Sequence, residues 1–250
     1  MNLLLVLVSV FCAAIFSIVI IGCVLSRQVL LVWYRARRAP SEDPLYIRML
    51  TLAREAGLPG TELYFIDSPA INSFSVGSRK NGSVVLSTGA IERLSDDELS
   101  SMMIHEIAHV SKGRRLPEIA TVLAGVLTTL PVAALWGAVF TGFGQDYDPA
   151  PKLIRFFATS IFAPPAALLI QIATSESVRY EADKYAALFC GSDAVIRMLS
   201  RLRDQNGWDA NPSHAALFIT DPLADEMYNS LFKTRPSIDD RLRRLQEEEY

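Results

Sequence analysis

The sequence predicts a mainly helical α+β protein with a small antiparallel sheet and about three transmembrane helices. Three long apolar runs, each with at most one charged residue, indicate the membrane spans. Short runs of β-forming residues between positions 63 and 86 indicate the sheet, and the other segments carry apolar residues at helical spacing. Half of the 250 residues are hydrophobic and the net charge is −3, so one water-facing domain fits beside the spans.

Composition argues against a nucleic-acid partner and against a disulfide scaffold. The basic residues are scattered or flank apolar runs, and they do not form a basic face with interleaved aromatics. Of the three cysteines, Cys12 and Cys23 lie in an apolar run and Cys190 stands alone. We therefore expect no disulfide framework and no cysteine metal site, which suits a reducing compartment.

Residues 1–26 are expected to form an N-terminal transmembrane anchor. The run from Leu3 to Leu25 has no charged residue and is followed by basic residues between Arg27 and Arg38. The positive-inside rule then places the following segment in the cytoplasm. Two alternatives are a cleaved signal peptide and a periplasmic lipoprotein processed at Ile20–Cys23, although no basic residue precedes the apolar core.

Residues 27–117 are expected to form a cytoplasmic half that contains the sheet. The expected elements are a helix from Leu45 to near Gly57 and strands at Leu63–Ile66, Ser73–Val76 and Ser83–Leu86, with a turn at Lys80–Gly82. Such a sheet can expose an edge strand, which can bind an extended peptide through main-chain hydrogen bonds.

The segment 105–109 reads His-Glu-Ile-Ala-His, and Ser95 with Glu98 predicts a capping box at the start of its helix. Positions i and i+4 share one helix face, so His105 and His109 can both bind one Zn²⁺ per chain. Glu106 then stands beside the open coordination position as a general base. The alternative is a pair of structural histidines on a helix.

Residues 118–174 are expected to form a transmembrane hairpin with a short external loop. The spans are Ile119 to Phe143 and Leu153 to Ala173, joined through a loop that carries Asp146 and Asp148. Basic residues before the first span agree with the orientation of the anchor. A pair of buried core helices is the alternative. Residues 175–250 return to a cytoplasmic helical half, with helices at Ser175–Phe189, at Asp193–Arg203 and from about Ile238.

Several stretches between about Leu63 and Leu245 together resemble the HtpX-like membrane metalloproteases, relatives of the CAAX prenyl proteases. They are Ser68–Gly77, which looks like the Asn-Ala-Phe segment of that family, Val84–Gly89 with the helix of His105–His109, Tyr180–Asp183 and Thr234–Leu242. The resemblance implies an integral-membrane zinc endopeptidase of the gluzincin type. In a bacterium it would lie in the inner membrane with its catalytic domain in the cytoplasm.

The resemblance also implies roles for particular residues. His105, His109 and a downstream glutamate would bind zinc, and Glu106 would be the catalytic base. Asn72 and the strand beside it, with Phe74, would help to hold the substrate backbone.

The chain departs from the family on the helix that should supply the third ligand. Arg179 stands where the family has glutamate, and arginine cannot donate a lone pair to zinc. Glu176 shares a helix face with Arg179 and is the preferred substitute, whereas Glu181 lies about 200° round the helix. Asp183 matches the family and is expected to orient a zinc-bound histidine.

A second departure is Arg235, which replaces the histidine of the family's closing segment. A cation there could stabilise an anionic intermediate but could not donate a proton in catalysis. Arg241 matches the family and carries such a role or holds the fold together.

The leading hypothesis is a membrane-anchored zinc-dependent endopeptidase that hydrolyses peptide bonds of membrane or misfolded proteins by means of zinc-activated water, as part of protein quality control. Its expected partners are protein or peptide substrates, the lipid bilayer, and membrane proteins or further copies of the chain. The alternative is a catalytically weakened or inactive homologue that acts as a membrane adaptor or regulator. Arg179 favours the alternative, and the intact Glu106 argues against it.

Overall fold

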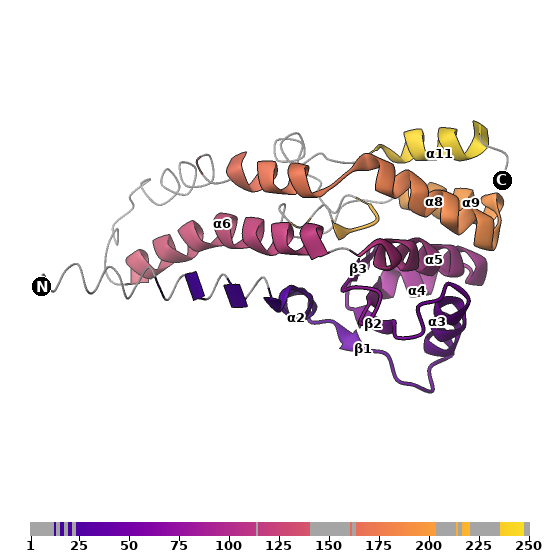
Figure 1. Cartoon of the computed structure of the whole chain (residues 1–250), viewed down its shortest axis with the longest axis horizontal. Helices are drawn as coiled ribbons and strands as arrows, with labels where there is room; N and C mark the ends of the chain where they lie inside the picture. The colour runs from indigo at the N-terminus through magenta and orange to yellow at the C-terminus, as the bar shows by residue number, and fades with distance from the viewer. Residues whose placement is uncertain are drawn as a thin grey trace, which may run out of the picture.

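The computed structural model describes residues 13, 16–17, 20–21, 24–113, 115–140, 161, 164–203, 214, 217–220 and 236–247, with side chains of the long helix only for 116–129 (Figure 1). The elements are α2 (Ser26–Trp33), β1 (Arg37–Arg38), α3 (Pro44–Glu55), β2 (Glu62–Ile66), β3 (Ser73–Val76), β4 (Ser83–Ser87), α4 (Thr88–Arg93), α5 (Asp96–Lys112), α6 (Arg115–Phe140), α8 (Glu176–Cys190), α9 (Ser192–Arg203) and α11 (Ile238–Glu247). The three predicted strands and the helices that follow α6 are confirmed within one or two residues.

The sheet is mixed, which corrects the prediction of an antiparallel sheet. Its strand order is β1-β2-β4-β3, and β2 pairs with β4 in parallel, while the β1–β2 and β3–β4 pairs are antiparallel. The turn signal at Lys80–Gly82 correctly predicted the β3–β4 hairpin. The connection from β2 to β3 carries the chain past the place of β4 to the far edge. The returning β4 therefore lies between them and runs in the same direction as β2.

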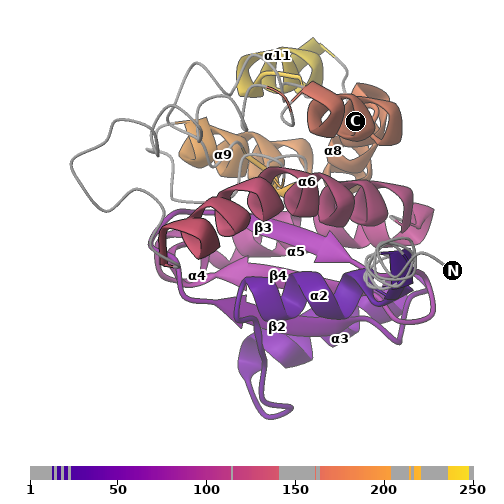
Figure 2. The ribbon, with the colours of Figure 1, turned by 90° about the vertical axis from the view of Figure 1, so that its left-hand side faces the viewer.

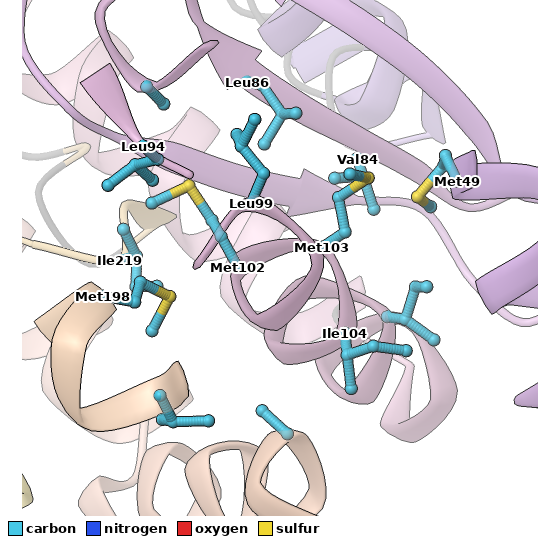
Figure 3. Packing of buried hydrophobic residues seen from close by; sticks show 14 of the residues in the cluster. Met49, Val84, Leu86, Leu94, Leu99, Met102, Met103, Ile104, Met198 and Ile219 are labelled. Atoms are coloured by element: carbon cyan, nitrogen blue, oxygen red, sulfur yellow. The ribbon is translucent and has the colours of Figure 1, made fainter. Parts of the chain in front are cut away.

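The two faces of the sheet pack against different helices (Figure 2). On one face, Val84 and Leu86 join a large apolar cluster with Met102 and Met103 of α5 (Figure 3). On the other face, Val85 joins a second cluster with residues of α2 and α6. The alternation along β4 is the period-2 pattern of a strand that is covered on both faces. β3, the last strand of the order, also has one face toward α5.

A side-chain cap at its start and a glycine at its end account for the bounds of helix α5. The Ser95 hydroxyl accepts a hydrogen bond from the Glu98 amide, and the Glu98 carboxylate accepts one from the Ser95 amide. This confirms the predicted capping box, which satisfies two of the amides that a helix start leaves unpaired. The helix ends at Gly113, whose φ of 72° lies in the left-handed region that favours glycine.

Helices α8 and α9 cover the side of α5 that faces away from the sheet, and α11 packs on α8 and α9, while α6 extends away from the sheet (Figure 1). The start of α6 is tied to two other elements by the buried carboxylate of Glu118, which accepts hydrogen bonds from the Ser26 hydroxyl and the Gly77 amide. Along α6, Ala120 and Ala124 pack against Ala166 and Ile170 of the helical residues 164–173.

Within the part of the chain that the structure describes, no helix is both long enough and apolar enough to cross a membrane. Each of the three predicted spans, 3–25, 119–143 and 153–173, includes positions outside the described residues. The division of the chain at residues 26, 117 and 174 therefore stays a prediction.

Candidate active site

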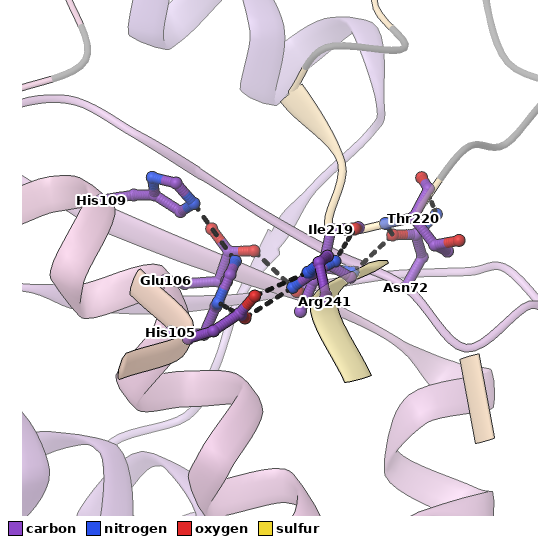
Figure 4. Close-up of polar contacts among 9 residues, drawn as sticks. Asn72, His105, Glu106, His109, Ile219, Thr220 and Arg241 are labelled. Carbon is purple, nitrogen blue, oxygen red and sulfur yellow. Dashed lines mark hydrogen bonds and ion pairs between the residues drawn. The ribbon is translucent and has the colours of Figure 1, made fainter. Parts of the chain in front are cut away.

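The two histidines of the 105–109 segment converge in the interior of the protein (Figure 4). Both side chains are buried, and their Nε2 atoms lie 3.2 Å apart. Two imidazole nitrogens that bind one tetrahedral Zn²⁺ at its usual bond length lie about 3.3 Å apart. The observed separation, which also suits a hydrogen bond between the rings, therefore fits a shared metal ion.

Glu106 is fully buried and is held from β3. Its Oε1 accepts a hydrogen bond of 2.8 Å from the Ser73 hydroxyl, whereas Oε2 has no hydrogen-bond partner among the described residues. A buried carboxylate oxygen without a partner is costly unless a ligand or water meets it. Ser73 thus fixes one oxygen of Glu106 and leaves the other available for chemistry.

Asp183 of α8 links His105 to Arg241 of α11. The Asp183 carboxylate lies 2.9 Å from His105 Nδ1 and accepts two hydrogen bonds of 2.7 Å from Nε and Nη2 of Arg241. The third guanidinium nitrogen, Nη1, donates to the carbonyl of Ile219 at 3.0 Å. A carboxylate on the far nitrogen of an imidazole fixes the ring orientation, as the outer partner of a metal-binding histidine does.

Burial and neighbouring charges shift the pKa values of His105 and Asp183 in opposite directions. Burial lowers the pKa of His105, although the contact with Asp183 raises it. Burial alone would raise the pKa of Asp183, but the charge and hydrogen bonds of Arg241 hold it well below its usual range. The aspartate is therefore an anion that keeps the His105 ring in place.

Among the residues that the structure describes, no carboxylate joins the two histidines as a third metal ligand. Among the described residues, no group of three His, Cys, Asp and Glu side chains is arranged to hold a metal ion. Arg179 is buried on the face of α8 that carries Asp183, one turn before it. Glu176 is exposed at the start of α8, and the exposed Glu181 pairs with Lys112 at the end of α5.

The predicted substrate residues lie on and beside the edge strand. Asn72 is buried and its side chain hydrogen-bonds the backbone of Thr220. The Phe74 ring points to the other face of the sheet, where it packs against Tyr34 and Phe218. The Phe74 ring thus lies on the face of the sheet opposite Glu106, and Asn72 lies against the backbone of Thr220 at the edge of the sheet. Arg235 lies outside the described residues.

Two features of the site were not expected from the sequence. Ser73 stands where the resembled motif has alanine, and the alternation along a strand would have placed it on the face opposite Phe74. The second is the apolar segment Leu217–Thr220, which lies along β3. No periodicity or turn signal marks that segment, so a sequence pattern could not have found it.

With this geometry established, comparison with known proteins decides the family. The model of peptidase family M48 matches residues 42–249. The chain belongs to peptidase family M48. Its relatives include a protease HtpX homolog of Syntrophobacter fumaroxidans, 36% identical over 88% of this chain and 82% of the relative. Another is a protease HtpX homolog of Syntrophotalea carbinolica, 33% identical over 88% of this chain and 81% of the relative. The predicted resemblance to HtpX-like proteases is confirmed.

The M48 chain also shares its fold with a solved structure. The crystal structure of Ste24p from S. mikatae superposes with a TM-score of 0.51 at 18% identity and covers 92% of this chain. The chain spans 56% of the length of that structure. The likeness supports the mainly helical fold with a small sheet.

Proposed function

We propose that this M48 chain is a membrane-anchored, zinc-dependent endopeptidase. The observation that carries the proposal is the pair of buried imidazoles, 3.2 Å apart at Nε2, on the helix turn that also carries buried Glu106. His105 and His109 would hold the ion. Glu176, which shares a face of α8 with Arg179 and Asp183, is our candidate for the third ligand, with Glu181 as the alternative.

When bound, zinc would supply a Lewis acid for the scissile carbonyl and for water. Glu106, oriented by Ser73, would take a proton from the attacking water and deliver it to the leaving nitrogen. Asp183 would keep the His105 ring in position. Arg241 and Arg235 are proposed to stabilise the negative charge that develops on the carbonyl oxygen, in which arginine serves as a permanent cation.

The substrates we propose are membrane or misfolded proteins, whose extended segments can reach the edge of the sheet. The apolar runs at 3–25, 119–143 and 153–173 support an integral membrane protein, and the basic residues that flank them support a cytoplasmic catalytic domain. A site next to the bilayer, at the start of α6, suits substrates that emerge from it.

Zinc content and proteolysis of the detergent-purified protein test this proposal. We expect about one zinc per chain and cleavage of a loosely folded protein such as casein. Glu106→Gln should retain zinc and lose at least about 100-fold in rate, because it removes the general base. Glu92→Gln, an exposed glutamate changed in the same way, is the matched control and should match wild type. Equal rates of wild type and Glu106→Gln would overturn the proposal.

Arg179 favours a second function, that of a weakened homologue that acts as a membrane adaptor or regulator. A buried guanidinium one turn from Asp183 stands where a third ligand is expected. Arg179→Glu separates the two functions, with Arg179→Gln as the control for loss of charge alone. If the zinc site is complete, Arg179→Glu should change zinc affinity little and Glu176→Ala should lower it. If the site lacks a ligand, Arg179→Glu should raise zinc affinity at least about tenfold and Glu176→Ala should have no effect.

A further inference from the structure

The edge of the sheet next to Glu106 is covered by the chain's own residues Leu217–Thr220. The Ile219 amide donates a hydrogen bond of 2.9 Å to the Ser73 carbonyl, and Phe218 forms an antiparallel bridge with Phe74. The three residues 217–219 are each at most 1% exposed. This short segment therefore lies beside β3, joined to it by an isolated antiparallel bridge, on the edge that β4 leaves open.

The backbone of this segment is held by side chains that the site provides (Figure 4). The Asn72 amide accepts from the Thr220 N–H and donates to the Thr220 carbonyl, each at 3.4 Å. Nη1 of Arg241 donates to the Ile219 carbonyl at 3.0 Å. Backbone groups of two consecutive residues are thus recognised without regard to their side chains, which is how a protein binds an extended peptide of varied sequence.

The segment lies where a substrate would need to bind. The Ser73 carbonyl accepts a hydrogen bond from the Ile219 amide, and the Ser73 hydroxyl donates one to Glu106. The same residue therefore contacts both the segment at the sheet edge and the proposed base. Peptides commonly bind to a sheet as an additional strand on an exposed edge. An extended substrate that reaches Glu106 along β3 would therefore occupy the space that Leu217–Thr220 now fills.

The Ile219 side chain shows what kind of residue this space accepts. It belongs to the large apolar cluster, where it lies near Leu94, Met102 and Met198 (Figure 3). We call the space that the Ile219 side chain fills between α5 and α9 the Ile219 pocket. The methionines around it are flexible enough to pack around different apolar shapes. A charged side chain there would be buried without a partner, which strongly disfavours its binding.

We propose that Leu217–Thr220 is an internal occupant of the peptide-binding subsites, and that a substrate binds as an antiparallel strand on β3 in its place, with a branched aliphatic side chain in the Ile219 pocket. The inference rests on the proposed function, because it names the substrate class and the regulation of that same site. It assigns Asn72 and Arg241 to the peptide backbone and the Ile219 pocket to side-chain selection.

Displacement of the segment is compatible with its contacts. A tethered strand competes at an effective concentration in about the millimolar range, so it weakens substrate binding without abolishing it. One bridge and the Ile219–Ser73 hydrogen bond join the segment to β3, and both Asn72 contacts are at 3.4 Å. A substrate must also replace the Arg241 bond at 3.0 Å and the packing of the buried side chains of residues 217–219. A substrate that extends further along β3 can form more main-chain bonds than this segment does.

Amide hydrogen exchange of the full-length Glu106→Gln protein in detergent tests the proposal without turnover. The probe is the hexapeptide Ala-Leu-Phe-Ile-Thr-Asp, which copies residues 216–221. We expect the Ile219 amide to be protected in the free protein and to exchange at least about tenfold faster when the hexapeptide is saturating. Binding of the hexapeptide with undiminished protection at Ile219, or no binding at millimolar concentration, would overturn the proposal.

Variants of the segment test the competition directly. Ile219→Pro removes the N–H that bonds to Ser73, so the protein should bind the hexapeptide at least about tenfold more tightly than wild type. Ile219→Val keeps the N–H and the branched side chain, and should behave as wild type. A hexapeptide with aspartate in place of its isoleucine should bind at least about tenfold more weakly. Unchanged affinity in both comparisons would contradict the proposal, and the exchange experiment decides it if Ile219→Pro does not fold.

These results are separable from those that test the proteolytic function. One outcome is that the protein binds no zinc and cleaves no substrate in these tests, yet still exchanges its segment for the hexapeptide. That result would refute the proposed enzymatic function and leave the proposed peptide-binding edge standing. A proteolytic protein whose Ile219 amide stays protected would be an enzyme that binds substrate elsewhere, and would refute only the internal occupant.

Discussion

The two faces of β3 perform different tasks although their residues alternate along four positions. Ser73 and Ser75 face α5, and Ser73 reaches the carboxylate of Glu106. Phe74 and Val76 face the opposite side, in a cluster with Phe218 and residues of α2. One strand thus carries polar chemistry on one face and apolar packing on the other. Substitutions on the two faces should have different consequences, for the site on one and for stability on the other.

The largest effect is expected on the aromatic face. Phe74→Ala removes a fully buried ring whose centroid lies 5.4 Å from that of Tyr34 and 5.2 Å from that of Phe218. The substitution should lower the free energy of unfolding by about 4 kcal/mol. Denaturant unfolding measures the loss. Zinc affinity of the folded fraction should be unchanged, and a marked loss of zinc affinity would show that the ring supports the site.

On the site's side, Asp183→Asn should weaken zinc binding by about 10- to 100-fold, because it removes the charge that orients His105. Competition with a fluorescent zinc chelator measures this affinity. Asp193→Asn, an exposed aspartate on α9, is the control. Equal zinc affinity of Asp183→Asn and wild type would separate the Arg241–Asp183–His105 contacts from metal binding and leave them a structural role.

The two serines on the polar face provide a matched pair. Ser73→Ala removes the donor to Glu106 and should lower kcat about tenfold with KM little changed, since a hydrogen bond to a charged group contributes about 1.5 kcal/mol or more. Ser75 is equally buried, and its hydroxyl has no partner among the described residues, so Ser75→Ala should have wild-type rates. In a Glu106→Gln background, Ser73→Ala should add no further loss. Equal rates of the two alanine variants would mean that Ser73 does not act through Glu106.

The smallest effect is expected from His214, at the border of the aromatic cluster. Its Nδ1 lies 2.7 Å from the Tyr34 hydroxyl, and burial lowers its pKa to about 4. Because the unfolded chain binds a proton more readily than the folded one, stability should be complete about one pH unit above 6.5 and fall as the pH drops through 6.5 toward 4. The loss between pH 7.5 and pH 5.5 is about 1.3 kcal/mol. His214→Gln should flatten this dependence in chemical unfolding at pH 7.5 and 5.5, and an equally steep fall in the variant would exclude His214 as the cause.

The sequence predicted those parts of the molecule that depend on local rules. The capping box at Ser95, the period-2 strands and the turn at Lys80–Gly82 are each fixed by neighbouring residues, and each was confirmed. The i, i+4 spacing of His105 and His109 placed their rings on one face for the same reason. These features require no knowledge of what packs against them.

The features that the sequence could not predict depend on contacts between distant segments. The parallel β2–β4 pair follows from the path between β2 and β3, which no turn signal marks. The approach of Ile219 to Ser73 joins positions separated by more than half of the chain. The sequence does not identify the third ligand, because the family's glutamate is Arg179 here and a helical wheel gives directions around α8 but not the reach of its side chains.

The pairing of Ser73 with Leu86 in the β3–β4 ladder has a consequence for the chemistry. Successive side chains of a strand point to opposite faces, so a slip of β3 by one residue would turn Ser73 toward the aromatic cluster and Phe74 toward Glu106. Glu106 would lose its donor, and a ring would enter the polar side of the sheet. Strand register, set by a hairpin remote from the proposed metal ligands, therefore decides whether the carboxylate that we propose as the base is correctly aimed.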